Sequence, residues 1–330
     1  MLHKAQIENS MNEDGSFDFS GCLDGIAEDL TDADLAVANM EFTLAGPPYS
    51  GYPSFCAPDE YAVYAAGCGI DVFLTANNHI LDKGERGLKR TLEAYRLMEK
   101  ELGIRMTGSA YDPEDEAGRF PLMLEVEGFR IGIVNFTYGT NAAAGKEYPG
   151  TFLTDRKKIS EAIKKAEEPD AGLIIALPHW GEEYRTEHSA AQEELARWLA
   201  ENGADLIIGT HPHVVQDTGV IPVTGSRGRK MTVPVVYSLG NAISNMSARN
   251  TQIGLLLTVR VCRDMWGRTT GLEPDYTFTW TSLPGRLGKR HCTVKVKDYL
   301  GKREKWKTAG EYDKMVSTYY NIKRLTGIED

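Results

Sequence analysis

The residues best suited to chemistry in this sequence are histidine, asparagine and glutamate side chains that directly follow short apolar segments. Two imidazoles stand one residue apart in His211-Pro212-His213, where proline stiffens the loop, so both can approach one metal ion or two adjacent ions. Asn78-His79 offers an amide oxygen and another imidazole, and Asp82 stands three residues later, where its carboxylate can orient that imidazole. His179 and Glu41 follow two further apolar segments. Side chains of these types are ligands for divalent metal ions.

Each of these motifs also has an ordinary structural explanation. His211-Pro212-His213 could be a surface turn, and Asn78-His79 could cap the helix that follows it. His179, beside Trp180, could be a buried histidine in an aromatic pocket, and Glu41 could be a helix cap or a surface carboxylate. Unrelated surface turns would have no reason to follow strands at one edge of a sheet. We therefore predict that the four segments converge on one metal site.

Short strands that alternate with helices are expected to position these side chains. Residues 84–103 have apolar side chains near helical spacing and end at a glycine, and a capping box at Ser189 and Gln192 begins another helix that Gly203 ends. This alternation predicts parallel strands joined by right-handed crossovers, and ligands of such sheets bind beyond the carboxyl ends of the strands. The expected strands cover residues 33–38, 70–75, 129–134, 172–177, 205–209 and 233–238.

The last part of the chain has a different pattern. Residues 253–261 and 276–280 are strand-like without an intervening helix, and a final helix is expected over residues 312–325. We predict one main α/β domain over residues 1–265 and a C-terminal unit over residues 266–330 that completes or flanks the core. Residues 286–307 hold nine Lys or Arg and two acidic residues, a local charge of +7, which is more often a solvated surface than a binding site.

Composition limits the class of protein. With 42% hydrophobic and 25% charged residues, the 330-residue chain is expected to fold around a core. The formal charge of −10 argues against nucleic acid as a partner, because such binding depends on lysine and arginine to neutralise phosphates. No apolar run reaches the ~18 residues that span a bilayer, and the start of the chain lacks the pattern of a signal peptide. The five cysteines form no C-x-x-C pair and are expected to be core or incidental residues.

The expected cofactor is a pair of divalent metal ions. Imidazole, amide and carboxylate ligands without a thiolate suit Mn, Fe, Zn or Mg better than a cysteine-based structural zinc site. Two such ions a few ångströms apart can generate a hydroxide and hold an in-line phosphoryl transfer. Trp180, Tyr184 and Tyr237 could wall a cleft around the ions, or could equally be core residues.

Five motifs in the same order resemble the bacterial capsule synthesis family known as CapA or PGA_cap. Together they span residues 34–241, and the resemblance is weaker outside that span. The motifs are ANME at 38–41, ANNHILDKGERGL at 76–88, HWGEEY at 179–184, GTHPHVVQ at 209–216 and YSLGN at 237–241.

This resemblance implies both a fold and a set of residue roles. The fold would be a four-layer α-β-β-α sandwich like that of calcineurin-like metallophosphoesterases, with a small C-terminal β/α appendage. His79 would stabilise or protonate the leaving oxygen, and Asp82 would orient His79. The implied metal ligands are Glu41, Asn78, His179, His211 and His213, and the expected substrate contacts are Trp180, Glu183, Tyr184 and Asn241.

The function implied by the resemblance is a role in poly-γ-glutamate capsule biosynthesis at the cell surface, outside the cytoplasm. We expect a metal-dependent hydrolase or transferase that acts on a phosphoester or on a bond of an anionic cell-surface polymer. Capsule synthesis membrane proteins are further expected partners. One alternative is a non-catalytic capsule-assembly or polymer-binding factor that retains the site. A cytoplasmic nucleotide phosphatase is a third possibility.

The chain departs from the family pattern at its start. Family members carry a strand that ends in Gly-Asp before the segment that resembles Met1-Leu2-His3, and the sequence as given begins after that strand. The aspartate is a metal ligand in the family. We therefore expect the His and Asn cluster to assemble in this chain but to bind metal weakly or not at all, and binding to be restored when the upstream strand is added.

Overall fold

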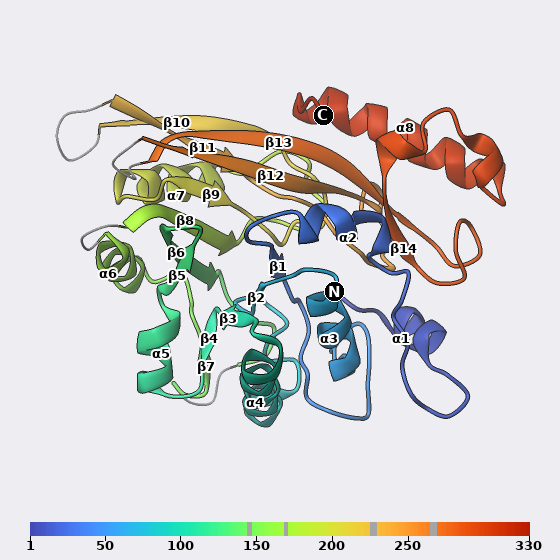
Figure 1. The fold of residues 1–330 in the computed structure, drawn as a ribbon, viewed down its shortest axis with the longest axis horizontal. Coiled ribbons are helices and arrows are strands. Elements are labelled where there is room, and N and C mark those ends of the chain that lie inside the picture. The colour runs from blue at the N-terminus through green and yellow to red at the C-terminus, as the bar shows by residue number, and fades with distance from the viewer. Residues whose placement is uncertain (144–146, 168–170, 225–229, 265–268) are drawn as a thin grey trace.

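The computed structural model describes residues 1–143, 147–167, 171–224, 230–264 and 269–330 (Figure 1). Two sheets lie face to face between two groups of helices, and a third sheet with a long helix packs beside them (Figure 1). The five cysteines are free thiols. Among the described helices, none combines the length and the apolar composition that a bilayer span requires.

The smaller sheet has the parallel order β1-β2-β3 and packs its outer face on helices α3 and α4. Phe73 of β2 lies in one apolar cluster with Leu88 and Leu92 of α4. Helix α4 ends as the sequence predicts, at Gly103 with a left-handed φ of 75°. The elements of this half are α1 (Lys4–Ser10), α2 (Asp24–Thr31), β1 (Val37–Asn39), α3 (Asp59–Gly67), β2 (Val72–Leu74), α4 (Gly84–Leu102) and β3 (Arg105–Thr107).

The larger sheet has six strands in the order β10-β11-β9-β8-β6-β5. Its four central strands are parallel, whereas the edge strands β5 and β10 are antiparallel to their neighbours. The capping box predicted at Ser189 and Gln192 begins α7. The elements of this half are β4 (Ser109–Ala110), α5 (Pro113–Arg119), β5 (Leu122–Val126), β6 (Phe129–Thr137), β7 (Gly150–Thr151), α6 (Arg156–Ala166), β8 (Ala171–His179), α7 (Ala190–Glu201), β9 (Leu206–Ile208), β10 (Thr218–Thr224) and β11 (Lys230–Val236).

Apolar side chains on both faces of the larger sheet define the layers. On one face, Ile174 of β8 packs with Ile163 of α6 and Leu199 of α7. On the other face, Leu177 of β8 packs with Val72 of the smaller sheet. The order of layers is therefore helices, small sheet, large sheet, helices, which confirms the predicted α-β-β-α sandwich. Burial on both faces is also why the segment around β8 is nearly all apolar.

The third sheet is antiparallel, in the order β12-β13-β14, and carries the C-terminal helix α8 on one face (Figure 1). Trp280 of β13 is fully buried with Met315 and Ile322 of α8. The predicted division between residues 265 and 266 lies outside the described residues, and the strands on either side of it pair with each other. The elements are β12 (Ile253–Arg263), β13 (Thr269–Ser282), β14 (Cys292–Lys295) and α8 (Ala309–Thr326), with short 3₁₀ turns at Val296–Asp298 and Arg303–Lys305.

One predicted strand is much shorter than its apolar run. Residues 33–38 were expected to form a buried strand, but β1 covers only Val37–Asn39, and Val37 is exposed. The reason is that β1 is the edge of the small sheet. The backbone N–H of Ala36 is satisfied by the side chain of Asp71, at 2.8 Å, instead of by a further strand.

Candidate metal centre

The predicted ligands meet where parallel strands of both sheets end. Glu41 and Asn78 follow β1 and β2 of the small sheet, and His179 is the last residue of β8 in the large sheet. His211 and His213 follow β9, the neighbour of β8. The ring centroids of His179 and His211 are 4.8 Å apart, so the segments converge as the sequence predicts.

Glu41 is the anionic member of this cluster. Its side chain is buried, and its Oε1 atom has no hydrogen-bond partner. That oxygen lies 3.7 Å from Nε2 of His179 and 3.6 Å from Nε2 of His213. One ligand atom each from Glu41, His179 and His211 lies within 4.8 Å of the others. An unpartnered buried carboxylate oxygen is costly unless a cation lies beside it.

The tautomer of His213 bears on the unpartnered oxygen of Glu41. Its Nδ1 lies 3.1 Å from Oδ1 of Asn241, whose amide nitrogen donates to the carbonyls of His213 and Thr251. The Asn241 oxygen can only accept, so His213 donates from Nδ1, and the neutral ring carries its lone pair on Nε2. In that form Nε2 of His213 and Oε1 of Glu41 are two acceptor atoms that face each other. A divalent ion would satisfy both, so the residues fit the metal that the sequence predicts.

His179 and His211 are held in the neutral form that binds metal. Burial lowers the pKa of His179 well below its usual value, and burial followed by the nearby His213 lowers the pKa of His211 to about 4. Nδ1 of His179 lies 2.9 Å from the Thr210 hydroxyl, and its Nε2 lies 2.9 Å from Oδ1 of Asn78. Nδ1 of His211 is buried and unpartnered.

A second set of ligand atoms lies on the open side of the cluster. The exposed carboxylate of Glu183 lies within 4.8 Å of ligand atoms of His211 and His213. Tyr184 beside it is 46% exposed, and its backbone N–H donates to the carbonyl of Pro212 at 2.8 Å. His211, His213 and Tyr184 have positive φ angles of 102°, 59° and 66°. Such left-handed conformations are strained for these residue types and concentrate at functional sites.

His79 is oriented as the sequence predicts. Its Nδ1 lies 2.7 Å from Oδ2 of Asp82, and that carboxylate also accepts the backbone N–H of Phe55 at 2.6 Å. The Phe55 ring meets the His79 ring edge to face, with the centroids 4.7 Å apart. The imidazole is thus fixed on two sides.

Two of the predicted substrate contacts, Trp180 and Asn241, are buried. Trp180 is 3% exposed, and its Nε1 donates to the carbonyl of Tyr237 at 2.9 Å. Trp180 and Tyr237 both belong to the core between the large sheet and its helices. From the sequence they could have been either cleft walls or core residues, and the structure makes them core residues. Asn241 is 6% exposed, and its amide is used by His213 and the backbone. Glu183 and Tyr184 remain accessible.

Sequence reasoning did not assign Thr210, Tyr138 or Asn141 to the site. Tyr138 is 51% exposed, and its ring lies 4.8 Å from that of His211, centroid to centroid. Asn141 contacts Asn78 and His79. The polar residues among 135–141 were the signal in the sequence, although residues 135–137 continue β6 as a buried strand. The sequence around these residues, however, does not show which of the polar side chains reach the metal centre.

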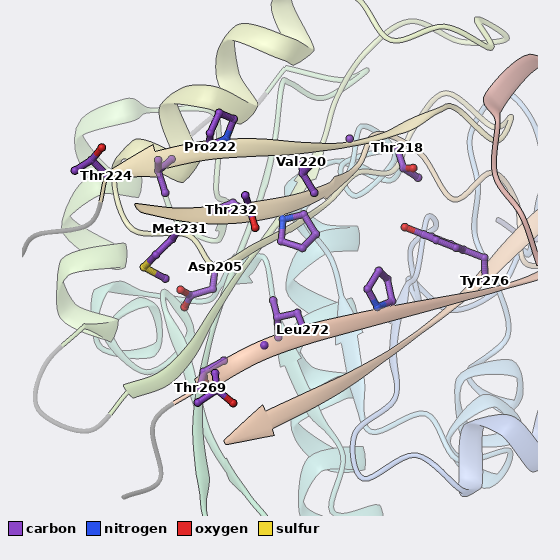
Figure 2. Close-up of a pocket in the computed structure, with 17 residues that line it drawn as sticks. Asp205, Thr218, Val220, Pro222, Thr224, Met231, Thr232, Thr269, Leu272 and Tyr276 are labelled. Carbon is purple, nitrogen blue, oxygen red and sulfur yellow. The ribbon is translucent and has the colours of Figure 1, made fainter. Parts of the chain in front are cut away.

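A cavity of about 960 Å³ lies elsewhere, between the β10–β11 hairpin and β13 (Figure 2). Val220 and Pro222 of β10 and Leu272 and Tyr276 of β13 are among the residues that line it (Figure 2). Asp205, also in its lining, precedes β9, whereas the metal centre follows that strand. The cavity and the centre are therefore at opposite ends of β9.

The fold and the site define an α/β protein of two stacked sheets with a candidate divalent-metal centre at their carboxyl edge. The chain belongs to the family described as "Bacterial capsule synthesis protein PGA_cap", whose model matches residues 1–246. Capsule biosynthesis protein CapA of Bacillus anthracis is 32% identical over 206 residues, which are 61% of this chain and 46% of that protein. PGA biosynthesis protein CapA of Bacillus subtilis (strain 168) is 30% identical over 199 residues, 60% of this chain and 48% of that protein. The chain thus spans about half the length of these curated relatives.

Solved structures with similarity to this chain include two nucleotidases and a phosphoesterase. The NAD nucleotidase of Haemophilus influenzae aligns with a TM-score of 0.49 and 15% identity, over 90% of this chain and 55% of that one. The 5'-nucleotidase precursor of Thermus thermophilus aligns with a TM-score of 0.47 and 15% identity, over 90% and 52%. The calcineurin-like phosphoesterase YfkN of Bacillus subtilis aligns with a TM-score of 0.41 and 14% identity, over 81% and 74%.

Proposed function

We propose that this chain is a metal-dependent hydrolase or transferase that acts on a phosphoester or on a bond of a cell-surface polymer in the biosynthesis of a poly-γ-glutamate capsule. The observation that carries the proposal is the pair of facing acceptors, Oε1 of Glu41 and Nε2 of His213, 3.6 Å apart in a buried site. The names of the curated relatives supply the capsule and the polymer.

The ligand sets support two divalent ions, Mn, Fe, Zn or Mg. When bound, such ions polarise a phosphoryl oxygen and activate water as a nucleophile. One ion would be held by Glu41, Asn78 and His179, and the other by Glu183 and His213. Glu41 could also serve the second ion, because its Oε1 lies 3.6 Å from Nε2 of His213. The neutral His211 ring has one lone pair and would serve one of the two ions. The exposure of Glu183 leaves this side of the centre open to a substrate.

His79 would carry the proton for the leaving oxygen. Asp82 accepts from Nδ1 of His79, so the ring presents its Nε2 atom for exchange of a proton. The Asp82 carboxylate is held by the Phe55 N–H and fixes the ring in one orientation. Tyr138 and Tyr184, both about half exposed, would flank the bound substrate.

The proposal also includes a cellular location and binding partners. We place the protein outside the cytoplasm at the cell surface, with an anionic polymer or a phosphoester as its substrate. Membrane proteins of capsule synthesis would be its partners. The curated relatives support this by their names alone.

A non-catalytic polymer-binding role would draw on the basic residues 286–307. Three of those cations are already in ion pairs: Arg290 with Asp18, Lys295 with Asp29 and Arg303 with Asp313, at 2.9, 2.9 and 2.7 Å. Paired cations attract a polyanion less strongly. These three ion pairs weaken the case for polymer binding by this segment, and the enzymatic role rests on the buried ligand cluster.

The test measures metal and hydrolysis in the same protein. Titration calorimetry with Mn²⁺ and Zn²⁺ is expected to show weak binding, and bis(p-nitrophenyl) phosphate is expected to be hydrolysed only by the metal-loaded protein. His211→Ala should lower the metal content and the hydrolysis without unfolding the chain, because the His211 ring belongs to none of the apolar core clusters and its Nδ1 has no hydrogen-bond partner to lose. His188→Ala, which removes an imidazole bonded to Asp217 outside the centre, is the matched control.

Three results would count against the proposal. Unchanged metal stoichiometry in His211→Ala would reject the ligand assignment. Metal binding without hydrolysis of phosphoesters or of poly-γ-glutamate would favour the non-catalytic role. Absence of metal binding in the wild-type chain would reject the metal centre.

A further inference from the structure

The loop that follows β6, residues 138–141, touches both halves of the candidate centre. The last residue of β6 is in register with His179, and the backbone N–H of Tyr138 donates to the carbonyl of His179 at 3.0 Å. The Tyr138 ring is parallel to the His179 ring, with centroids 6.4 Å apart. At the other end of the loop, the backbone N–H of Asn141 donates to the carbonyl of Asn78 at 2.8 Å. The loop thus joins a residue of the large sheet to one that follows the small sheet.

The side chain of Asn141 makes contacts with two site residues at once. Its Oδ1 accepts a hydrogen bond from Nδ2 of Asn78 at 3.3 Å. Its Nδ2 lies 3.3 and 3.4 Å from the two ring nitrogens of His79. Asn141 therefore bridges a proposed metal ligand and the proposed proton carrier.

These contacts decide which way the Asn78 amide points. An asparagine side chain has one oxygen and one nitrogen, and only the oxygen can bind a metal ion. Because the nitrogen of Asn78 donates to Asn141, the oxygen must face the opposite way, where it lies 2.9 Å from Nε2 of His179. A rotated Asn78 amide would set its oxygen against the oxygen of Asn141 and its NH₂ group against the metal ligands. Asn141 thus disfavours the unproductive orientation.

We propose that Asn141 is a positioning residue of the metal centre: its side-chain oxygen fixes the Asn78 amide with the oxygen toward the metal, beside the ring of His79. This inference rests on the proposed function, because it assigns Asn141 a role only if Asn78 binds metal. Outer partners of this kind typically change metal affinity 10- to 100-fold when they are removed. The side chain of Asn141 is exposed, so it adds little to the stability of the core.

The experiment compares a substitution that removes the acceptor of Asn141 with one that keeps an acceptor. Asn141→Leu keeps the approximate size and removes the acceptor, whereas Asn141→Asp keeps an acceptor for the Asn78 nitrogen. By calorimetry, Asn141→Leu is expected to weaken Mn²⁺ binding about 10-fold or more, and Asn141→Asp to stay within about 3-fold of the wild type. The melting temperatures of the metal-free proteins should be equal. Asn12→Leu is the control for the substitution itself. Asn12 is exposed, and among the described contacts its side chain bonds only Ser16.

The outcomes separate this inference from the function on which it rests. Wild-type Mn²⁺ binding with unchanged affinity in Asn141→Leu overturns the inference alone. Equal losses in the Leu and Asp variants overturn the role of the oxygen, and a lower melting temperature of metal-free Asn141→Leu would show a structural role instead. A wild-type chain that binds no Mn²⁺ overturns the metal centre, and the role of Asn141 with it.

Discussion

At the scale of single residues, the centre is made of groups that are poorly satisfied by the protein alone. Oε1 of Glu41 and Nδ1 of His211 are buried without partners, and Nε2 of His213 faces another acceptor. Each such group costs free energy of folding, on the order of 1–3 kcal/mol. A stable fold that retains several of them at one point is expected where a ligand satisfies them.

His291, outside the metal centre, makes stability depend on pH. It is 2% exposed, its Nε2 lies 2.8 Å from Oδ1 of Asn245, and burial lowers its pKa to about 4. The unfolded chain, where the histidine pKa is about 6.5, binds more protons between these two values. We therefore expect the free energy of unfolding to fall as the pH is lowered from about 6.5 to about 4.

The measurement is urea unfolding of the metal-free protein at about pH 7 and about pH 5. His291→Gln removes one titrating group, so the difference in unfolding free energy between the two pH values should become smaller. The same difference in variant and wild type would show that His291 is not buried in the neutral form.

At the scale of elements, the loops of the centre are tied to one another by buried amides. Gln216, which is fully buried, accepts from Nε2 of Gln192 in the first turn of α7. Its own Nε2 donates to the carbonyls of Arg185 and Glu187 at 2.9 and 3.1 Å. One side chain after β9 thus holds the start of α7 and the loop that carries Glu183. This link explains how an exposed loop keeps a defined position beside His211 and His213.

Gln216→Ala should destabilise the protein and loosen that loop. The change leaves buried polar groups without partners, at a cost of about 1–3 kcal/mol in the free energy of unfolding. Urea unfolding measures the loss, and faster proteolysis within residues 181–188 reports the loosened loop. Glu194→Ala, which removes an exposed ion pair with Arg156 from α7, should cost less than about 1 kcal/mol. Equal effects of the two changes would contradict the role of Gln216.

At the scale of the whole molecule, the third sheet contacts a loop of the metal centre. This sheet lies outside residues 1–246, which the family model matches. Gly240 and Gly254 form a bridge between the loop of Asn241 and β12, and the Thr293 hydroxyl donates to the carbonyl of Ala242 at 2.6 Å. Asn241 in turn orients His213. The C-terminal sheet is therefore connected to a proposed metal ligand through one loop.

Gly254→Ala tests this connection. A Cβ atom at Gly254 would lie 2.2 Å from the backbone oxygen of Asn241, so the loop must shift. We expect a loss of about 1–3 kcal/mol in the free energy of unfolding, together with weaker Mn²⁺ binding because His213 loses its partner. Gly271→Ala, on the paired strand with no atom within 4 Å of the added Cβ, is the control. Unchanged metal affinity in Gly254→Ala would show that the contact between the third sheet and the Asn241 loop does not affect the metal centre.

Features that depend on neighbours along the chain could be predicted from the sequence. The end of α4 at Gly103, the capping box at Ser189 and the polar residues after each apolar strand are local features, and the structure confirms them. The layer order followed from the family resemblance and is confirmed by the apolar clusters.

Which polar groups meet, and how they are oriented, could be seen in the folded chain but not in its sequence. The bond between Asn78 and His179 joins residues 101 positions apart, and the orientation of the Asn78 amide depends on Asn141, 63 positions away. Trp180 packs in the apolar core between the large sheet and its helices, where the backbone carbonyl of Tyr237, 57 positions away, accepts its indole N–H. Burial and amide orientation are set by contacts between distant segments, and a pattern read along one chain carries no record of those contacts.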